Sequence, residues 1–374
     1  MITTTELDNL NKPYKIFAEV LDQKALEQFI NTMKLDCVVQ GALMPDAHCG
    51  YTLPIGAVVA VKDVVFPSFV GYDIGCGMCA IKTNHDINEI KKHAQDIFKK
   101  IYENIPVGFS HNSKPTKWNY KHIPQTNVMK EIFNNGGLQQ IGTLGGGNHF
   151  IEIGQDENQK CWIIIHSGSR GIGHATATHY MKLASGDGKA REGFFGLNVN
   201  SQQGKDYIID LNFCLQLALE NRMEIMRRIF NVINKFVKGD ALWDTLINRN
   251  HNHAEKKHDL WIHRKGATHA EEGMMGVIPG NMRDGSFIVK GKGNPDALYS
   301  SSHGAGRILG RKEAKRTIDL DDFSETMSGI IAKVSENTLD ESPFAYKSIF
   351  DVMKQQEQLV EVIAHVKPIL NVKG

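Results

Sequence analysis

Apolar residues recur at helical spacing in two long stretches of the chain, at residues 206–236 and 346–366. Apolar side chains three and four positions apart form one stripe on a helix, and that stripe can be buried. Pro368 follows the second stretch and cannot continue a helix. Both stretches are therefore predicted to be helices that pack one face against the core.

Four shorter apolar runs, at residues 55–61, 161–165, 259–262 and 285–289, have the length and composition of strands. Strands and helices do not alternate regularly along the chain, which favours an α+β fold. Residues 184–205 are rich in glycine and are expected to form an insertion or a mobile loop. No repeat or linker marks a boundary, so residues 1–374 are expected to form one domain.

The composition narrows the class of protein without naming a partner. With 374 residues, 41% of them hydrophobic, the chain can bury a large core. Its 43 Lys and Arg nearly cancel its 42 Asp and Glu, so the net charge of +1 neither indicates nor excludes a nucleic-acid partner. No signal peptide or membrane span is evident, and six scattered cysteines argue against a disulfide scaffold. A reducing cytoplasm is therefore the expected location.

Residue types that bind metals lie at the ends of the predicted strands. In "GYDIGCGMC", Asp73 and Cys76 are three residues apart within a glycine-rich run, where a carboxylate and a thiolate can meet one cation. Two other interpretations stay open: Cys76 and Cys79 form a C-x-x-C pair, and the glycines imitate a dinucleotide-binding motif. Both would open a helix, whereas the following "CAIKTN" has the pattern of a strand.

Histidines gather in a similar way further along the chain. "GTLGGGNHFIEI" runs from a glycine-rich turn into His149, and His166 closes an apolar strand before a Ser-Gly-Ser-Arg loop. The tract "NRNHNHAEKKH" offers His251, His253 and His258, a pattern typical of both metal sites and solvated loops. One aspartate, one cysteine and three histidines suit borderline cations such as manganese or zinc.

The stretch "SSHGAGR" places His303 before a bare Gly-Ala-Gly turn that ends at Arg307. Alone, this pattern is typical of a surface loop. Together with a metal site and with cationic side chains that could hold phosphates, a histidine on exposed backbone suggests phosphoryl or nucleotidyl transfer.

These motifs, with "MPDAHCG", "IPGNM", "FAYKSI" and the terminal "VKG", closely resemble the RtcB family of GTP-dependent RNA ligases, in order and across almost the whole chain. The resemblance implies packed β-sheets and surrounding helices around a metal-lined cleft. It also implies a cytoplasmic enzyme that uses GTP and two Mn²⁺ ions. Such an enzyme joins RNA ends that carry a 2′,3′-cyclic phosphate or a 3′-phosphate to 5′-hydroxyl ends, in tRNA splicing or RNA repair.

By the same resemblance, His303 is the catalytic nucleophile that becomes guanylylated, and Cys76 bridges the two metal ions. The implied metal ligands are Asp73, Cys76, His149, His166 and His251. The implied RNA-binding residues are Asp46, Arg170, Lys265 and Arg307. The implied GTP-binding residues are Asn148, His149, Phe150, Ile151, Glu152, His251, Asn252, Pro279, Gly280, Asn281, Met282, Ser286, His303, Gly304, Ala305, Gly306, Tyr346 and Lys373.

The chain departs from the family pattern in the predicted nucleotide loop. Asn281 and Arg283 stand where a serine and a glycine are usual. Arg283 could add a phosphate contact or narrow the pocket, so nucleotide preference is the property these changes would alter.

Three other functions compete with the ligase. A binuclear metal phosphodiesterase would use the same ligands but gives His303 no covalent role, and a non-catalytic RNA-binding paralogue predicts no labelled intermediate. A redox protein would need Cys79 more than Cys76.

Outside the proposed site, His253, His258 and His263 are expected to be structural or solvent-facing. His174 and His179 are expected to be ordinary residues of a helix start, and Cys37, Cys49, Cys161 and Cys214 to be core thiols.

Overall fold

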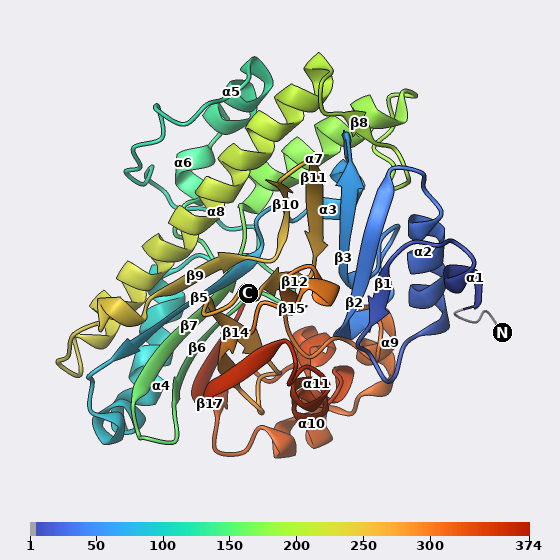
Figure 1. Cartoon of the computed structure of the whole chain (residues 1–374). Helices are drawn as coiled ribbons and strands as arrows, with labels where there is room; N and C mark the ends of the chain where they lie inside the picture. The colour runs from blue at the N-terminus through green and yellow to red at the C-terminus, as the bar shows by residue number, and fades with distance from the viewer. Residues whose placement is uncertain (1–4) are drawn as a thin grey trace.

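The computed structural model describes residues 5–374, in which a large curled sheet stands beside a smaller sheet and helices cover the outer faces (Figure 1). The large sheet has the strand order β13-β14-β17-β6-β7-β5-β9, and β16 pairs with β17 in parallel. Its first and last strands, β13 and β9, come into contact, so the sheet nearly closes on itself. The strands are β5 (Gly77–Thr83), β6 (Phe150–Gln155), β7 (Cys161–Ser167), β9 (Ile247–Asn250), β13 (Met275–Pro279), β14 (Ser286–Gly291), β16 (Ile331–Ala332) and β17 (Val360–Lys373).

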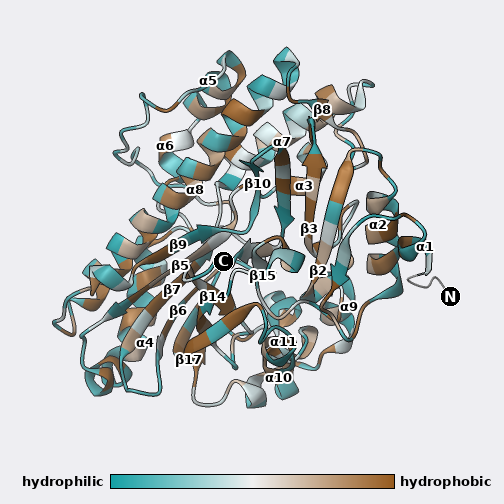
Figure 2. Cartoon of the chain, viewed as in Figure 1, coloured by the Kyte–Doolittle hydropathy of each residue, from teal (hydrophilic) through white to brown (hydrophobic). Residues whose placement is uncertain are grey.

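The second sheet has the order β1-β2-β3-β11-β10, and Figure 2 shows apolar residues along β2 and β3. One face packs against α2, and the other shares a core with α11 and β14. Two short pairs, β12 with β15 and β4 with β8, complete the strands. Their bounds are β1 (Tyr14–Ile16), β2 (Val38–His48), β3 (Ile55–Lys62), β4 (Val64–Val65), β8 (Leu197–Asn198), β10 (Asn252–Lys257), β11 (Leu260–Lys265), β12 (Ala267–His269) and β15 (Ser300–Ser302).

Helices α4 and α8 cover the outer face of the large sheet. Residues such as Ile97 of α4 and Ile229 of α8 pack against Ile163 and Ile165 of β7. The helices are α1 (Thr5–Asp8), α2 (Gln23–Met33), α3 (Pro67–Val70), α4 (Ile87–Asn104), α5 (Asn127–Asn134), α6 (Gly137–Gln140), α7 (Arg170–Ser185), α8 (Gln202–Ile233), α9 (Arg311–Thr317), α10 (Leu320–Thr326) and α11 (Ile349–Gln355). Four 3₁₀ turns are η1 (Trp243–Thr245), η2 (Pro295–Ala297), η3 (Glu336–Glu341) and η4 (Pro343–Ala345).

Strand alternation divides the large sheet into two faces. In β7, Ile163 and Ile165 face the helices, whereas Trp162, Ile164 and then His166 face the interior of the curled sheet. Polar residues that follow this inward alternation therefore gather at one end of the enclosed space, and that end carries the candidate site.

The mixed α+β class is confirmed, as are the four predicted strands and the helix predicted at 206–236, which begins earlier, at Gln202. The helix predicted at 346–366 is wrong in its second half: α11 ends at Gln355, and Val360–Lys373 forms β17. Pairing with β6 and β14 outweighs the helical spacing, and Pro368 lies inside this strand at a register shift, where a missing N–H is tolerated.

The glycine-rich stretch 184–205 contains the short strand β8 and the start of α8. Among residues 5–374, no helix has both the length and the apolar character needed to span a membrane.

Candidate functional site

Four side chains gather around Cys76, which lies just before β5 (donor cluster: Asp73, Cys76, His149, His166 and His251). Cys76 Sγ lies 3.3 Å from Nε2 of His149 and 3.1 Å from Nε2 of His166. Nε2 of His149 lies 3.1 Å from Oδ2 of Asp73, and Nε2 of His166 lies 3.3 Å from Nε2 of His251. The structure thus brings together all five residues that the sequence suggested as metal ligands.

The donor cluster forms two groups that share Cys76. One is Cys76, His166 and His251, and the other is Asp73, Cys76 and His149; the donor atoms within each group lie within 4.8 Å of one another. Thiolate, imidazole and carboxylate together suit a borderline divalent cation, and a shared thiolate can bridge two such ions. The residues present therefore fit two cations.

The protonation of the histidines agrees with ligation. Nδ1 of His166 lies 3.0 Å from the carbonyl oxygen of Asn148, to which it donates its proton, so Nε2 keeps its lone pair. Burial lowers the pKa of His166 and His251 well below the ordinary value and keeps both imidazoles neutral, as metal binding requires.

His303 follows β15 and is held by an aspartate beneath it. Oδ2 of Asp46, in β2, lies 2.6 Å from Nδ1 of His303 and accepts hydrogen bonds from the backbone N–H groups of His303 and Gly304 at 3.1 and 3.2 Å. Burial opposes ionisation of Asp46, but His303 outweighs it and lowers the pKa of the carboxyl. The structure places Asp46 against His303. The resemblance, by contrast, had grouped Asp46 with the RNA-binding residues.

The ring of His303 lies 4.8 Å from the ring of His251, between centroids, so the imidazole adjoins the donor cluster. Nδ1 of His303 donates its hydrogen bond to Asp46, so the free lone pair of the ring is on Nε2. A neutral imidazole that is held in one tautomer beside a cation site can act as a nucleophile toward phosphorus.

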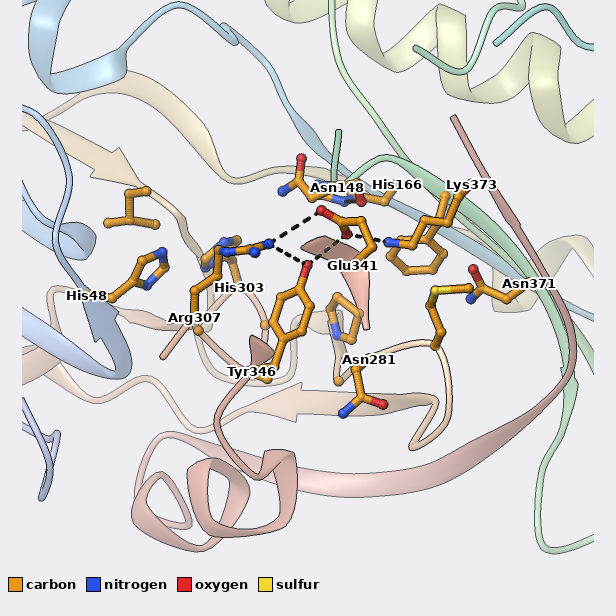
Figure 3. Close-up of a pocket in the computed structure, with 18 of the residues that line it drawn as sticks. His48, Asn148, His166, Asn281, His303, Arg307, Glu341, Tyr346, Asn371 and Lys373 are labelled. Atoms are coloured by element: carbon orange, nitrogen blue, oxygen red, sulfur yellow. Dashed lines mark hydrogen bonds and ion pairs between the residues drawn. The ribbon is translucent and has the colours of Figure 1, made fainter. Parts of the chain in front are cut away.

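A first cavity opens in front of His303 (Figure 3). It lies between the end of β15, the 279–282 loop and the last residues of β17. Of the predicted nucleotide-binding residues, the following line it: Asn148, Phe150, Pro279, Gly280, Asn281, Met282, His303, Gly304, Ala305, Gly306, Tyr346 and Lys373. The other predicted nucleotide-binding residues lie outside this cavity: His149, Ile151, Glu152, His251, Asn252 and Ser286.

Behind this cavity lies a polar layer on the inward face of β6, β14 and β17. Glu152, whose pKa burial raises to about 8, lies opposite Asn371 in β17, with Nδ2 of Asn371 3.5 Å from Oε2. Oε1 of Glu152 and Oγ of Ser286 are buried and have no hydrogen-bond partner among residues 5–374. These two atoms can form hydrogen bonds with a polar ligand. Ile151, by contrast, points toward the helices and packs in the outer core.

The sequence comparison agrees with this geometry. The family model described as tRNA-splicing ligase RtcB matches residues 28–136 and 120–374, which is most of the chain. The chain belongs to the RtcB family.

Named relatives resemble this RtcB chain along its whole length. The RNA-splicing ligase RtcB1 of Escherichia coli (strain ATCC 25922) is 32% identical over 411 aligned residues, covering 100% of this chain and 99% of the relative. The tRNA-splicing ligase RtcB of Nanoarchaeum equitans is 28% identical, with 98% and 96% covered, and that of Thermococcus kodakarensis is 26% identical, with 96% and 93% covered.

A second, larger cavity of this RtcB chain adjoins the donor cluster and also reaches His303. It is lined by Asp73, Cys76, His251 and Asn252, and by the cationic residues Lys265, Arg307, Arg311 and Lys347. Asn252 also connects two segments of the site. Its Nδ2 donates a hydrogen bond to the carbonyl oxygen of Asp73, and its Oδ1 accepts one from the N–H of Gly266.

Of the four residues predicted to meet RNA, Lys265 and Arg307 line this second cavity, and Asp46 lies beneath His303. Arg170 lines neither cavity. It donates hydrogen bonds to Thr143 Oγ1 and to the carbonyl oxygen of Gly108, and so pins the glycine-rich turn that leads to His149.

Sequence reasoning missed Glu341, at the end of η3. Its Oε2 accepts hydrogen bonds from Lys373 Nζ and Tyr346 Oη at 2.7 and 2.8 Å (Figure 3). Its Oε1 lies 2.7 Å from Nη1 of Arg311. Burial opposes ionisation, but Lys373 and Arg311 lower the pKa of this carboxyl. Glu341 thereby orients two cationic side chains of the first cavity, and no spacing in "SENTLDESPF" indicates that role.

The two departures in the nucleotide loop have different positions. Asn281 lines the first cavity and donates a hydrogen bond to Oδ2 of Asp284. Arg283 lines neither cavity and instead bonds Asp284 and Thr326. Its side chain therefore does not narrow either cavity.

The histidines and cysteines that the sequence set apart from the proposed site all lie outside the donor cluster. His253 and His263 are buried, His258 is exposed, and His174 and His179 lie in α7. All six cysteines are free; Cys79, Cys161 and Cys214 are buried, whereas Cys37 and Cys49 are only half-buried. Cys79 faces the helices, away from Cys76, so the two do not form a redox pair.

Proposed function

We propose that this protein is an RNA ligase that joins 2′,3′-cyclic phosphate or 3′-phosphate ends to 5′-hydroxyl ends through a guanylylated His303. The observation that carries the proposal is the position of His303. It is oriented by Asp46, adjoins the donor cluster and opens onto both cavities. The names of its relatives, RNA-splicing and tRNA-splicing ligases, support the same reaction class.

In the first step, the lone pair of His303 Nε2 attacks the α-phosphorus of GTP. A nitrogen–phosphorus bond forms, the bond between the α-phosphorus and the bridging oxygen breaks, and pyrophosphate leaves with the electron pair. Asp46 stabilises the positive charge that develops on the imidazole, because its carboxylate accepts a hydrogen bond from Nδ1–H and stays ionised.

In the second step, an oxygen of the RNA 3′-phosphate attacks the guanylyl phosphorus and releases His303. A cyclic phosphate end is first opened by water. The 5′-hydroxyl oxygen then attacks the phosphorus of the activated RNA end, GMP leaves, and the hydroxyl proton passes to a base in solution. The joined strand therefore retains the RNA phosphate, and GMP and pyrophosphate are the by-products.

The donor cluster would hold two Mn²⁺ ions, one at each of its two groups, and Cys76 belongs to both groups. Bound cations would neutralise phosphate charge and raise the electrophilicity of phosphorus. The ring of His251, a member of the donor cluster, adjoins that of His303, so phosphate oxygens at the cations and the nucleophile can share one space.

The nucleotide and the RNA have separate places in this scheme. The first cavity takes the guanosine, with Lys373 in its wall and Glu152 and Ser286 in the polar layer behind it, and the second takes RNA ends beside Lys265 and Arg307. The presence of six free cysteines supports a reducing compartment such as the cytoplasm.

The test is incubation with GTP labelled at the α-phosphate and Mn²⁺, followed by denaturing electrophoresis. Acid-labile label should appear on the wild type and on His174→Ala, a histidine variant outside both cavities, but not on His303→Ala. If the wild type binds GTP and Mn²⁺ yet takes no label, the ligase mechanism is wrong. Cleavage of RNA phosphodiesters without label would then favour the binuclear phosphodiesterase.

A further inference from the structure

The guanidinium of Arg222, on the inward side of α8, lies directly behind the donor cluster and is fully buried. Nη1 donates hydrogen bonds to the carbonyl oxygens of Gly75 and Ser167 at 2.9 and 2.8 Å. Nη2 donates to Oδ1 of Asn250, and Nε donates to Oδ1 of Asn248, both at 2.7 Å. One planar group therefore connects three separate segments of the large sheet.

Each of these segments carries a residue of the donor cluster next to the atom that Arg222 binds. The adjacent pairs are Gly75 with Cys76, Ser167 with His166, and Asn250 with His251. A hydrogen bond to the neighbouring residue restricts the backbone from which each ligand side chain projects. Because the guanidinium is rigid and planar, it also fixes the spacing of its four acceptors, which are two backbone carbonyl oxygens and two side-chain amide oxygens of β9.

The neighbouring residue on α8 extends this arrangement. Oδ1 of Asn221 accepts hydrogen bonds from the backbone N–H groups of Gly142 and Thr143, and Nδ2 donates to the carbonyl oxygen of Gly168. The turn that begins at Gly142 leads to His149. Asn221 and Arg222 together thus hold every segment from which the histidines of the donor cluster arise.

The charge of Arg222 is not explained by ordinary packing. Within residues 5–374, no carboxylate lies within 4 Å of its guanidinium, and all four acceptors are neutral. Burial of a cation without an adjacent anion is unfavourable because the charge loses its hydration, whereas an apolar side chain of similar volume would fill the space without that loss. A role at the adjacent site accounts for the guanidinium, since an anionic ligand set there gives the charge a counterpart.

We propose that Arg222 is a positioning residue whose guanidinium holds Cys76, His166 and His251 at the separations that a divalent cation requires. The inference rests on the proposed function only in that the donor cluster binds such a cation. It concerns no contact between Arg222 and the substrates.

Cobalt(II) provides a probe that does not depend on ligation activity, because a thiolate ligand gives a charge-transfer band and the ligand-field bands report coordination geometry. The metal-free full-length chain would be titrated with Co²⁺ as wild type, Arg222→Gln, Arg222→Lys and Arg228→Gln. Arg228 is the matched control: it lies on the same helix and also donates four hydrogen bonds, but to Glu224, Asn112, Gly142 and Thr116.

Arg222→Gln is expected to raise the Kd for Co²⁺ by about 10- to 100-fold, as loss of a residue that orients ligands does, and to change the ligand-field bands. Arg222→Lys keeps the charge but cannot span three acceptors, so its Kd should also rise. Arg228→Gln should lower the melting temperature and leave the Kd and the bands unchanged.

The outcomes separate the two proposals. Absence of a cobalt–thiolate band in the wild type would contradict the metal site, and with it the proposed function. A wild-type band with the same Kd in Arg222→Gln and Arg228→Gln would overturn the role of Arg222 alone. If circular dichroism shows that Arg222→Gln does not fold, Asn250→Ala removes one of its four bonds. That variant should raise the Kd several-fold, and an unchanged value would also overturn the inference.

Discussion

Oδ2 of Asp46 lies 2.6 Å from Nδ1 of His303 and also accepts two backbone N–H groups, while Oδ1 has no hydrogen-bond partner among residues 5–374. One carboxylate oxygen thus fixes the position of both the ring and the main chain of His303. Such an arrangement favours a single tautomer of the imidazole before any substrate binds.

Asp46→Asn should slow transfer of label from α-labelled GTP to the protein by about 10²- to 10⁴-fold, the range typical of lost acid–base assistance. The amide is neutral and cannot stabilise the imidazolium that forms during attack. Initial rates of labelling would measure the effect, and the Kd for Co²⁺ should stay at the wild-type value. An unchanged labelling rate would remove Asp46 from the mechanism.

Glu152 gives the nucleotide-free, metal-free protein a pH-dependent stability. Burial raises the pKa of its carboxyl to about 8, so the folded state keeps a proton that the unfolded state releases near the ordinary pKa of about 4.3. Its contribution to the free energy of unfolding therefore falls as the pH rises between these two values, and it levels off above the upper one.

Glu152→Gln removes that titration, so this variant should gain melting temperature relative to the wild type as the pH is raised from about 5 to about 8. Differential scanning calorimetry at several pH values would measure the difference. Glu131→Gln, which changes an exposed glutamate of α5, is the matched control for the loss of one carboxyl group. A constant difference for Glu152→Gln would show that its carboxyl is ionised in the folded protein.

The parts of the site that the sequence reveals are those in which the residue type itself carries the chemistry. Cysteine, histidine and aspartate at strand ends, and a histidine before bare glycine backbone, pointed to the donor cluster and to His303. The residues that orient them could not be found this way. In the sequence, Arg222 is one cation on a long amphipathic helix, and its hydrogen-bond partners lie 26 to 147 positions away along the chain.

The helix expected at 346–366 shows the same limit for the fold. Apolar residues in "LVEVIAHVKPIL" satisfy helical spacing as well as they satisfy a two-sided strand. Only the free edges of β6 and β14, which the rest of the chain provides, decide that this segment is β17. The consequence is functional, because β17 carries Asn371 and Lys373 to the first cavity.

Cys76 and Cys79 should differ sharply despite their C-x-x-C spacing. Cys76→Ser is expected to abolish the cobalt–thiolate band and to reduce labelling below detection, because the shared ligand of both groups is lost. Cys79→Ser places a hydroxyl in the outer core, which costs about 1–3 kcal/mol of stability but leaves the band in place. Optical titration with Co²⁺ and thermal unfolding would separate the two effects. Retention of the band in Cys76→Ser would mean that another thiol binds the metal.

A carboxylate occupies the cationic wall on which RNA is expected to bind. Oε2 of Glu192 lies 3.4 Å from Nζ of Lys265, and both side chains are about nine-tenths buried in the second cavity. An RNA phosphate must compete with this carboxylate for Lys265, so Glu192→Gln should tighten binding of a single-stranded RNA with a 3′-phosphate, by up to about tenfold for one repelling charge. Fluorescence anisotropy at several salt concentrations would measure it.

Lys265→Met tests the other half of the pair. It should weaken RNA binding and reduce the slope of log K against log salt by about 0.7, the value for one lost phosphate contact on a single strand. Lys130→Met, which removes an exposed cation of α5 outside both cavities, should leave affinity and slope unchanged. If Lys265→Met and Lys130→Met bind RNA alike, the strand follows another path. Tighter binding in Glu192→Gln would then reflect only the lost repulsion, because Lys265 would make no contact with phosphate.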